Sequence, residues 1–282
     1  MHRISAVILA LCSVFVFNSC QGLGGMLDGL DKPTASVSGV SFQGFDAESI
    51  TLAFDLDVTN PYGVPLPVAG LDWSLASAGK SFLSGQSAGS ASIPANGRTT
   101  VPLLARIPFQ QALAVLSGIR PGNVVPYEAD LGIRVDAPGL DQIRLPLKKT
   151  GEFPIPNVPK IEVQNLSWDS LSFTSAAATV LLGIENTNDF PIDLSRLAYD
   201  LTLGGQQVAR SAINSGTSLE QGVNKPLEIG FNLSPASLGL AAFNMLRGSD
   251  ANYGLSGIMD LDTPFGKLAM PYNSAGKTPL TR

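Results

Sequence analysis

Histidine and cysteine are nearly absent from this chain of 282 residues, which has one histidine and two cysteines. The histidine is His2 and the cysteines are Cys12 and Cys20, so all three lie at the very start of the chain. Serine and cysteine triads need a histidine, and zinc sites of the Cys/His type need several of these residues close together. We therefore expect no enzymatic activity, no metal site and no cofactor.

Charged residues are also scarce, at 15% of the chain, and acidic residues outnumber basic ones to give a net charge of -5. Nucleic-acid binding needs clustered basic side chains, so we expect no nucleic-acid partner. The hydrophobic fraction of 44% is large enough for a core and excludes a disordered chain.

An almost wholly apolar run occurs at residues 4–17, directly after His2 and Arg3. The run is short for a membrane span and is typical of a signal peptide. It ends at Ser19-Cys20, which resembles a bacterial lipobox, where cleavage before the cysteine is coupled to its acylation. We expect residues 1–19 to be a signal peptide and Cys20 to hold the protein on a membrane through acyl chains. An ordinary signal peptide cut nearby, or an uncleaved anchor, is the alternative.

The residues after Cys20 predict where the protein goes. Residues 20–32 are rich in glycine and should form a flexible tether for the lipid anchor. Gln21 follows the cysteine where an aspartate would resemble the inner-membrane address of bacterial lipoproteins. The expected location is the bacterial cell envelope, with the protein lipid-anchored at the outer membrane.

The rest of the chain is an internal repeat with a constant offset of 126 residues. This offset places Asn60 on Asn186, Pro65 on Pro191 and Trp73 on Tyr199. It predicts two domains, residues 33–153 and residues 158–282. Three prolines within residues 153–159 should make the segment between them a stiff, extended connector.

Each copy reads as a series of short strands. Apart from Ala53, residues 49–59 alternate between apolar and polar side chains, as a strand does when one face is buried and the other is wet. The same alternation recurs at 71–75, 131–135, 143–147, 197–203 and 227–233. Many short strands separated by turn residues predict an all-β fold of two antiparallel β-sandwiches.

One short helix is expected in each copy, beginning near Pro108 and near Pro235. In copy two the apolar positions between Leu238 and Leu246 form a stripe, with Gly248 able to end the helix. We expect each helix to close one end of its sandwich. An amphipathic helix lying on a membrane is less favoured, because the polar positions, such as Gln110 and Asn244, provide no basic face.

The segment from Asn60-Pro61 through Pro65 to Trp73 resembles the late embryogenesis abundant type 2 family, also called the WHy domain. Copy two keeps Asn186 and Pro191 but has Thr187 where the family has a proline. The resemblance implies an immunoglobulin-like or fibronectin-like sandwich, an association with desiccation, cold and salt stress, and no shared catalytic residues.

The motif residues have structural interpretations of their own. Asn60 and Asn186 should fix the exit of a strand as a turn, next to Pro61, Pro65 and Pro191; contact with a ligand is the alternative for the asparagines. Trp73 and Tyr199 should point into the two cores with their flanking leucines, and the alternative makes them exposed binding anchors.

Two pairs of carboxylates stand two residues apart: Asp55 with Asp57, and Asp260 with Asp262. Such pairs can hold calcium or act as acid and base, but the solvated face of a strand is the more ordinary interpretation.

Together these features predict a non-enzymatic envelope lipoprotein that protects against desiccation or other stress. The alternative is an adhesion or assembly module whose sandwich edges bind an envelope protein. A carboxylate-based hydrolase is the least favoured hypothesis.

Overall fold

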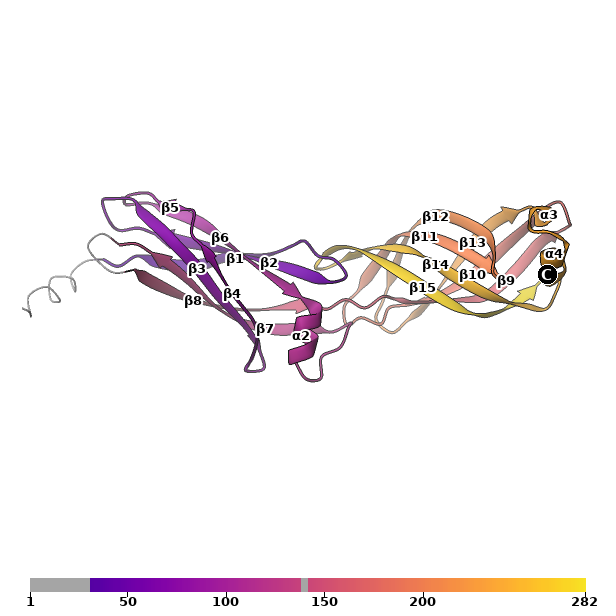
Figure 1. Ribbon diagram of the computed structural model, residues 1–282, viewed down its shortest axis with the longest axis horizontal. Coiled ribbons are helices and arrows are strands. Elements are labelled where there is room, and N and C mark those ends of the chain that lie inside the picture. The colour runs from indigo at the N-terminus through magenta and orange to yellow at the C-terminus, as the bar shows by residue number, and fades with distance from the viewer. Residues whose placement is uncertain (1–30, 138–141) are drawn as a thin grey trace, which may run out of the picture.

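The computed structural model describes residues 31–137 and 142–282, which are built mainly of β-strands (Figure 1). The predicted signal peptide and Cys20 lie outside the described residues. Within the described ranges, none of the helices has both the length and the apolar character that crossing a membrane requires.

Copy one is a sandwich of two antiparallel sheets. One sheet has the strand order β1-β2-β6, and the other has the order β4-β3-β7-β8, with the short β5 paired to β3. The strands are β1 (Thr34–Gln43), β2 (Ser49–Thr59), β3 (Leu66–Ser77), β4 (Lys80–Ala88), β5 (Ser92–Ile93), β6 (Arg98–Pro108), β7 (Val124–Val135) and β8 (Ile143–Pro154). The helix α2 (Phe109–Val115) follows β6 at the end nearer copy two (Figure 1).

Copy two repeats this order of strands, with β9-β10-β13 in one layer and β12-β11-β14-β15 in the other. Its strands are β9 (Lys160–Leu171), β10 (Ala176–Glu185), β11 (Ile192–Leu203), β12 (Gln206–Leu219), β13 (Asn224–Leu233), β14 (Asp250–Thr263) and β15 (Gly266–Thr281). The two layers are joined at one edge, because β15 pairs in parallel with β9 where Leu280 lies opposite Leu166. The predicted all-β fold of two β-sandwiches is confirmed, and this parallel pairing is an addition that the alternation of residues did not reveal.

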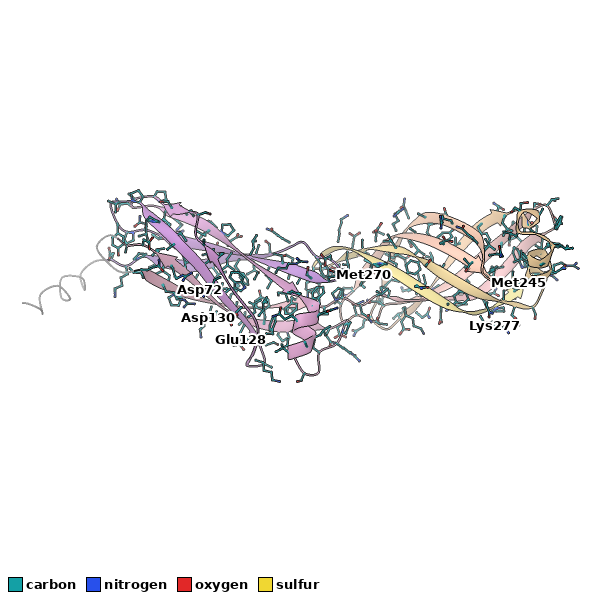
Figure 2. All side chains as sticks on the ribbon, viewed as in Figure 1. Asp72, Glu128, Asp130, Met245, Met270 and Lys277 are labelled. Carbon is teal, nitrogen blue, oxygen red and sulfur yellow. The ribbon has the colours of Figure 1, made fainter. Side chains whose placement is uncertain are left out.

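The helical segment of copy two differs from the prediction. It consists of two short helices, α3 (Pro235–Leu238) and α4 (Leu240–Leu246), instead of one. Gly239 separates them with φ 87° and ψ 166°, a conformation outside the helical region that glycine tolerates. Ser234 makes no side-chain cap and instead donates its hydroxyl to the carbonyl of Thr174. Met245 of α4 marks this end of the molecule in Figure 2.

Alternation along the strands explains why each copy has its own core. In β2 the side chains of Ile50, Leu52, Phe54, Leu56 and Val58 are fully buried. Asp55 and Asp57 lie on the opposite, wetter face of the same strand. Copy one and copy two have separate clusters of buried side chains, each of which draws on both of its layers.

The connector between the copies is packed and is not a free spacer. Phe153 and Ile155 are buried in the core of copy one. Phe265, in the turn between β14 and β15, packs edge-to-face against Phe42 of copy one and against Phe190. The ring centroids are 5.5 Å apart in the first pair and 5.4 Å apart in the second. The backbone N–H of Asp189 donates to the carbonyl of Gly122 at 2.7 Å. These contacts hold the two sandwiches end to end (Figure 1).

Candidate functional site

Asn60 is buried at the end of β2, where its side chain links neighbouring backbone segments. Its Nδ2 donates to the carbonyls of Val64 at 2.8 Å and Pro94 at 3.0 Å. Its Oδ1 accepts from the backbone N–H of Tyr62 at 2.9 Å, the bond that defines an Asx turn. With 1% of its surface exposed, the side chain has no room for a ligand. Asn60 therefore ties the exit of β2 to the strand and turn around Pro94.

Asn186 has the same arrangement in copy two. Its Nδ2 donates to the carbonyls of Phe190 at 2.8 Å and Leu219 at 3.0 Å, and its Oδ1 accepts from the N–H of Asn188 at 2.9 Å. The side chain is fully buried. Both asparagines thus replace missing backbone partners at the point where a strand ends.

Asn188 explains why copy two departs from the Asn-Pro pattern. Its Oδ1 accepts from the backbone N–H of Asn157 at 2.7 Å, and its Nδ2 donates to the carbonyl of Asn157 at 2.9 Å. The Asn157 side chain also donates to the hydroxyl of Thr187, the residue that stands in place of the proline. The corner of copy two therefore holds the connector, a role that its sequence alone did not suggest.

The three prolines of the motif lie beside these corners and are less buried than the asparagines. Pro61 directly follows Asn60 and is half-buried, whereas Pro65 and Pro191 are exposed. Pro65 precedes β3 and Pro191 precedes β11, so each holds the backbone extended as the strand begins.

Trp73 and Tyr199 are not equally buried. Tyr199 is 6% exposed and belongs to the core of copy two. Trp73 is only half-buried: it packs against the core of copy one while its indole ring lies over Gly85 on the edge strand β4. Both side chains thus pack against a core, but Trp73 is less buried than Tyr199, because its ring lies over β4, the outer strand of its layer.

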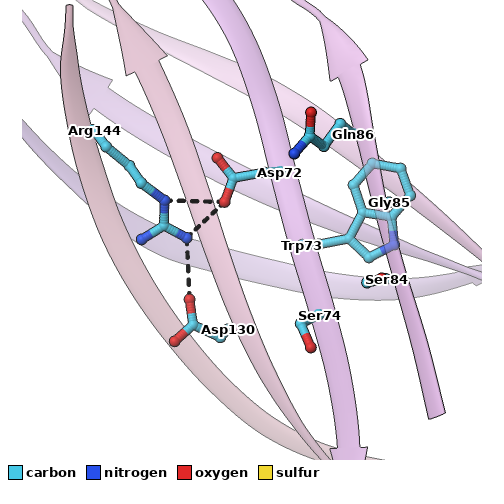
Figure 3. Close-up of a pocket in the computed structure, with 8 residues that line it drawn as sticks. All are labelled: Asp72, Trp73, Ser74, Ser84, Gly85, Gln86, Asp130 and Arg144. Carbon is cyan, nitrogen blue, oxygen red and sulfur yellow. Dashed lines mark hydrogen bonds and ion pairs between the residues drawn. The ribbon is translucent and has the colours of Figure 1, made fainter. Parts of the chain in front are cut away.

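A shallow polar groove of about 220 Å³ lies on the outer face of β3, β4, β7 and β8 (Figure 3). Arg144 reaches across β7 and donates to Asp72 at 2.9 Å through Nε, with a further bond from Nη2 to Asp130 at 3.1 Å. Gly132 of β7 makes this reach possible, because a Cβ there would overlap the guanidinium. The groove is lined by Asp72, Trp73, Ser74, Ser84, Gly85, Gln86, Asp130 and Arg144.

The charges of this groove neutralise one another. Hydrogen bonds to Asp72 raise the pKa of Arg144 above its ordinary value, so its guanidinium remains charged. The guanidinium of Arg134 lies 3.9 Å from Asp72 on the other side. Two arginines and two aspartates thus form a balanced ion-pair network on an open surface, where such pairs stabilise weakly. Nothing in the arrangement isolates one carboxylate as an acid or base.

Three of the four carboxylates singled out in the sequence also have ordinary partners. Asp57 accepts from the hydroxyl of Thr100 at 2.6 Å. Asp260 pairs with Arg196 at 3.3 Å and Asp262 pairs with Lys267 at 3.5 Å. No group of three or more histidine, cysteine, aspartate or glutamate residues that could hold a metal ion is found in residues 31–137 and 142–282.

A second groove, of about 430 Å³, opens in copy two between the start of β9 and the middle of β15. Tyr253 and Tyr272 form its inner wall, and Lys160 and Glu162 stand at its rim, where they pair at 3.6 Å. Burial raises the pKa of Tyr272, and its hydroxyl donates to the carbonyl of Ala198 at 3.0 Å. This hydroxyl is held in a structural bond and is not free to react.

The motif asparagines, the half-buried tryptophan and the paired carboxylates therefore do not come together in one site. Asn60 and Asn186 lie at the corners of two different copies, and Trp73 lies on β3, next to the outer strand β4. The charged side chains around the two grooves pair with one another. The arrangement stabilises the fold and offers polar surfaces, and it does not assemble a nucleophile with a base.

Comparison with known proteins finds the same domain twice in the chain. A family model described as "Late embryogenesis abundant protein" matches residues 55–151 and residues 181–276. The desiccation protectant protein Lea14 homolog of Glycine max is 30% identical over 129 residues, which cover 46% of this chain and 85% of that protein. Late embryogenesis abundant protein Lea14-A of Gossypium hirsutum is 26% identical over 132 residues, covering 47% of this chain and 87% of that protein.

Solved structures give matches of similar extent. A solution structure of a late embryogenesis abundant protein is 22% identical, with a TM-score of 0.40, and the match covers 48% of this chain and 80% of that chain. A crystal structure of a protein from Archaeoglobus fulgidus is 13% identical, with a TM-score of 0.33, and the match covers 45% of this chain and 98% of the other.

Proposed function

The chain belongs to the late embryogenesis abundant type 2 family, and from this premise we propose that it is a non-enzymatic protein that protects the cell envelope against desiccation and related stress. The observation that supports this proposal is the double match: each copy carries the domain found in relatives named for desiccation. We further propose that the domain is of the WHy type, because copy one has the motif Asn60-Pro61 at the end of β2.

The outer strands suggest how such a protein acts as water is lost. In β4 and β12 the exposed side chains are mainly hydroxyls and amides, such as Ser84, Gln86, Gln207 and Asn214. These groups donate and accept hydrogen bonds in the same way as water. We propose that they replace lost water on neighbouring envelope molecules, while the buried asparagine corners keep each sandwich folded.

The proposed location rests on the N-terminal sequence. Cleavage before Cys20 and acylation of that residue would anchor the protein in a membrane, with the outer membrane as the proposed site. The test is metabolic labelling with palmitate, which should mark the wild-type protein and not Cys20→Ser. If the wild-type protein takes up no label, the anchor is ruled out, whereas the protective role could still hold.

The protective role is tested by survival after drying. A strain that lacks this gene should lose viability on desiccation and regain it with the wild-type gene. The gene with both Asn60→Ala and Asn186→Ala should not restore viability, because both corners would fail. A matched control with Asn232→Ala, on the exposed face of β13, should restore it. Equal survival of the deletion strain and its parent would refute the role.

The competing proposal is an assembly module that binds one envelope protein through a sandwich edge. Its support is that β4 and β12 are outermost strands, each paired on one side only in the sheet order of the described residues. Pull-down of the full chain should then recover one partner in stoichiometric amount, which the protective role does not require.

A further inference from the structure

The end of copy two that carries α3 and α4 lies farthest from the start of the described chain (Figure 1). This end exposes large apolar side chains. Phe173, in the turn between β9 and β10, is 43% exposed, and Leu240, the first residue of α4, is 65% exposed. We call this surface the distal tip and define it by Phe173, Leu240, Phe243, Arg247 and Arg282. Large exposed apolar side chains that cluster together mark a contact surface more often than scattered ones do.

The turn that carries Phe173 is firmly built. The hydroxyl of Ser172 donates to the carbonyl of Ser175 at 2.8 Å and accepts from the N–H of Ser175 at 3.1 Å. The hydroxyl of Ser234, just before α3, donates to the carbonyl of Thr174 at 2.9 Å. Phe173 is therefore exposed because a closed turn holds it outward, and not because the turn is unformed.

Helix α4 has a buried face and an exposed face. Leu246 and Ala242 are buried beneath it, at 0% and 8% exposure. Leu240, Phe243 and Arg247 follow at spacings of three and four residues, so they share a second face beside the buried one. The Phe243 ring packs edge-to-face against Phe173 at 5.3 Å, and the guanidinium of Arg247 stands 5.8 Å from the Phe243 ring centroid. The exposed part of this helix thus places Leu240 and Phe243 close to the cation of Arg247.

The same end of copy one is covered by copy two. There, Phe45 in the turn between β1 and β2 packs edge-to-face against Phe109 of α2 at 6.4 Å. Phe45 packs against the cores of both copies. The fold therefore uses this end as a contact surface in copy one, and in the described part of copy two nothing covers it.

The charge of the distal tip indicates which class of partner the tip can bind. No aspartate or glutamate occurs in α3 or α4, and the neighbouring Asp250 is paired with Lys277 at 3.1 Å. Arg282 lies beside Arg247, to whose carbonyl its Nη2 donates at 3.1 Å. Although the whole chain has a net charge of -5, the side chains of this end combine aromatic and aliphatic groups with two arginines. That combination is complementary to an anionic lipid surface.

We propose that the distal tip inserts into the interface of an anionic lipid bilayer. A stable protein partner requires some 20–30 residues on each side, roughly 800 Å² per partner, whereas a bilayer accepts a narrow tip with few apolar side chains. The inference goes beyond the protective role and does not depend on it. It also revises the expectation that the helix serves only as a cap, since α4 caps the core on one face and presents apolar groups on the other.

The test uses the full chain with Cys12→Ser and Cys20→Ser, labelled with an environment-sensitive fluorophore at Ala241→Cys, which is exposed beside Leu240. Vesicles of phosphatidylglycerol should shift the emission to shorter wavelength. Because the probe reports only its own surroundings, binding through residues 4–17 cannot produce this shift. Phe173→Ser combined with Leu240→Ser should weaken the apparent affinity by at least about tenfold. Leu104→Ser, an exposed leucine of copy one, should leave the affinity unchanged.

The remaining outcomes separate the other occupants. Loss of the shift in 1 M salt and with phosphatidylcholine vesicles would support the anionic surface. An equal shift with both lipids would overturn it. A shift without vesicles that grows with protein concentration would identify a second copy of the chain as the occupant, and no shift with phosphatidylglycerol would refute the proposal. A control label at Ala88→Cys, on copy one, should not respond.

Discussion

At the scale of single residues, Asn60 and Asn186 each join three segments of their copy with one buried amide. Replacing Asn60 by alanine would leave partly buried carbonyls and one partly buried N–H without partners. Each such orphan costs about 1–3 kcal/mol, so we expect Asn60→Ala to lower the stability of copy one by about 2–4 kcal/mol.

Urea unfolding can measure this loss in each copy separately, because the two tryptophans, Trp73 and Trp168, lie in different copies. Fluorescence of Trp73 in a Trp168→Phe background reports copy one. The exposed Asn232→Ala should change the stability by less than about 0.5 kcal/mol. A similarly small effect of Asn60→Ala would mean that the corner is held by backbone bonds alone.

Trp73 and Gly85 act as a pair across β3 and β4, since a Cβ at Gly85 would overlap the indole ring. We expect Gly85→Ala to destabilise copy one by about 1–3 kcal/mol through overpacking, and Trp73→Ala by about 2–3 kcal/mol because the ring is only half-buried. In the Trp73→Ala background, Gly85→Ala should cost much less.

A thermal-melting double-mutant cycle measures this coupling. Because Trp73 is itself replaced, copy one must be followed by circular dichroism, with Trp168 fluorescence reporting an unchanged copy two. Strict additivity of the two substitutions would show that the ring does not rest on Gly85.

At the scale of elements, alternation predicted the strands because burial on one face imposes a period of two. Residues 49–59 illustrate this, since β2 covers the same residues and buries the predicted face. Alternation does not state which strands pair at a distance. The meeting of Leu280 with Leu166, and of Arg144 with Asp72, joins residues far apart in the chain, so no local pattern signals either contact.

Local signals also left two features undetermined, the break in the helical segment of copy two and the exposure of Trp73. Gly239 stands inside a helical pattern of apolar residues, where a glycine is tolerated, and only its positive φ reveals that the helix breaks there. Trp73 obeys the alternation of β3, but its exposure depends on β4 being the outermost strand. Both outcomes depend on the tertiary environment of the residue.

Strand β15 gives copy two a predictable sensitivity to alkali. Burial raises the pKa of Tyr272 above its ordinary value near 10, and burial likewise raises the pKa of Tyr199. The stability contributed by these neutral hydroxyls is fully present below pH 10. It is lost as the pH rises further, because the unfolded chain releases its protons first.

We expect Tyr272→Phe to lower the stability of copy two by about 1 kcal/mol at pH 7, through loss of the bond to Ala198. The same variant should lose less stability than wild type between pH 9 and pH 11, since one ionising group is gone. Urea midpoints followed by Trp168 fluorescence would measure both effects. Parallel pH profiles for the two proteins would contradict the assignment.

At the scale of the whole molecule, two features join the copies. One is a cluster of three aromatic rings that pack edge-to-face, and the other is a pair of hydrogen bonds that hold the connector. Phe265 contacts Phe42 of copy one and Phe190 of its own copy, and Asn188 holds the backbone of Asn157. Each copy has its own core, so each should fold alone. The junction therefore governs orientation more than folding.

Phe265→Ala should uncouple the copies. Each aromatic pair contributes about 0.5–1.5 kcal/mol beyond the area it buries, so loss of both pairs should remove about 1–3 kcal/mol of coupling. Unfolding followed at Trp73 and at Trp168 should then show midpoints that shift apart, and small-angle scattering should show a broader range of end-to-end distances. Phe173→Ala, which removes the same side chain from the opposite end of copy two, should do neither. If the scattering of Phe265→Ala matches that of wild type, the hydrogen bonds between Asn188 and Asn157 are sufficient to hold the copies in line, and the cluster of aromatic rings is dispensable.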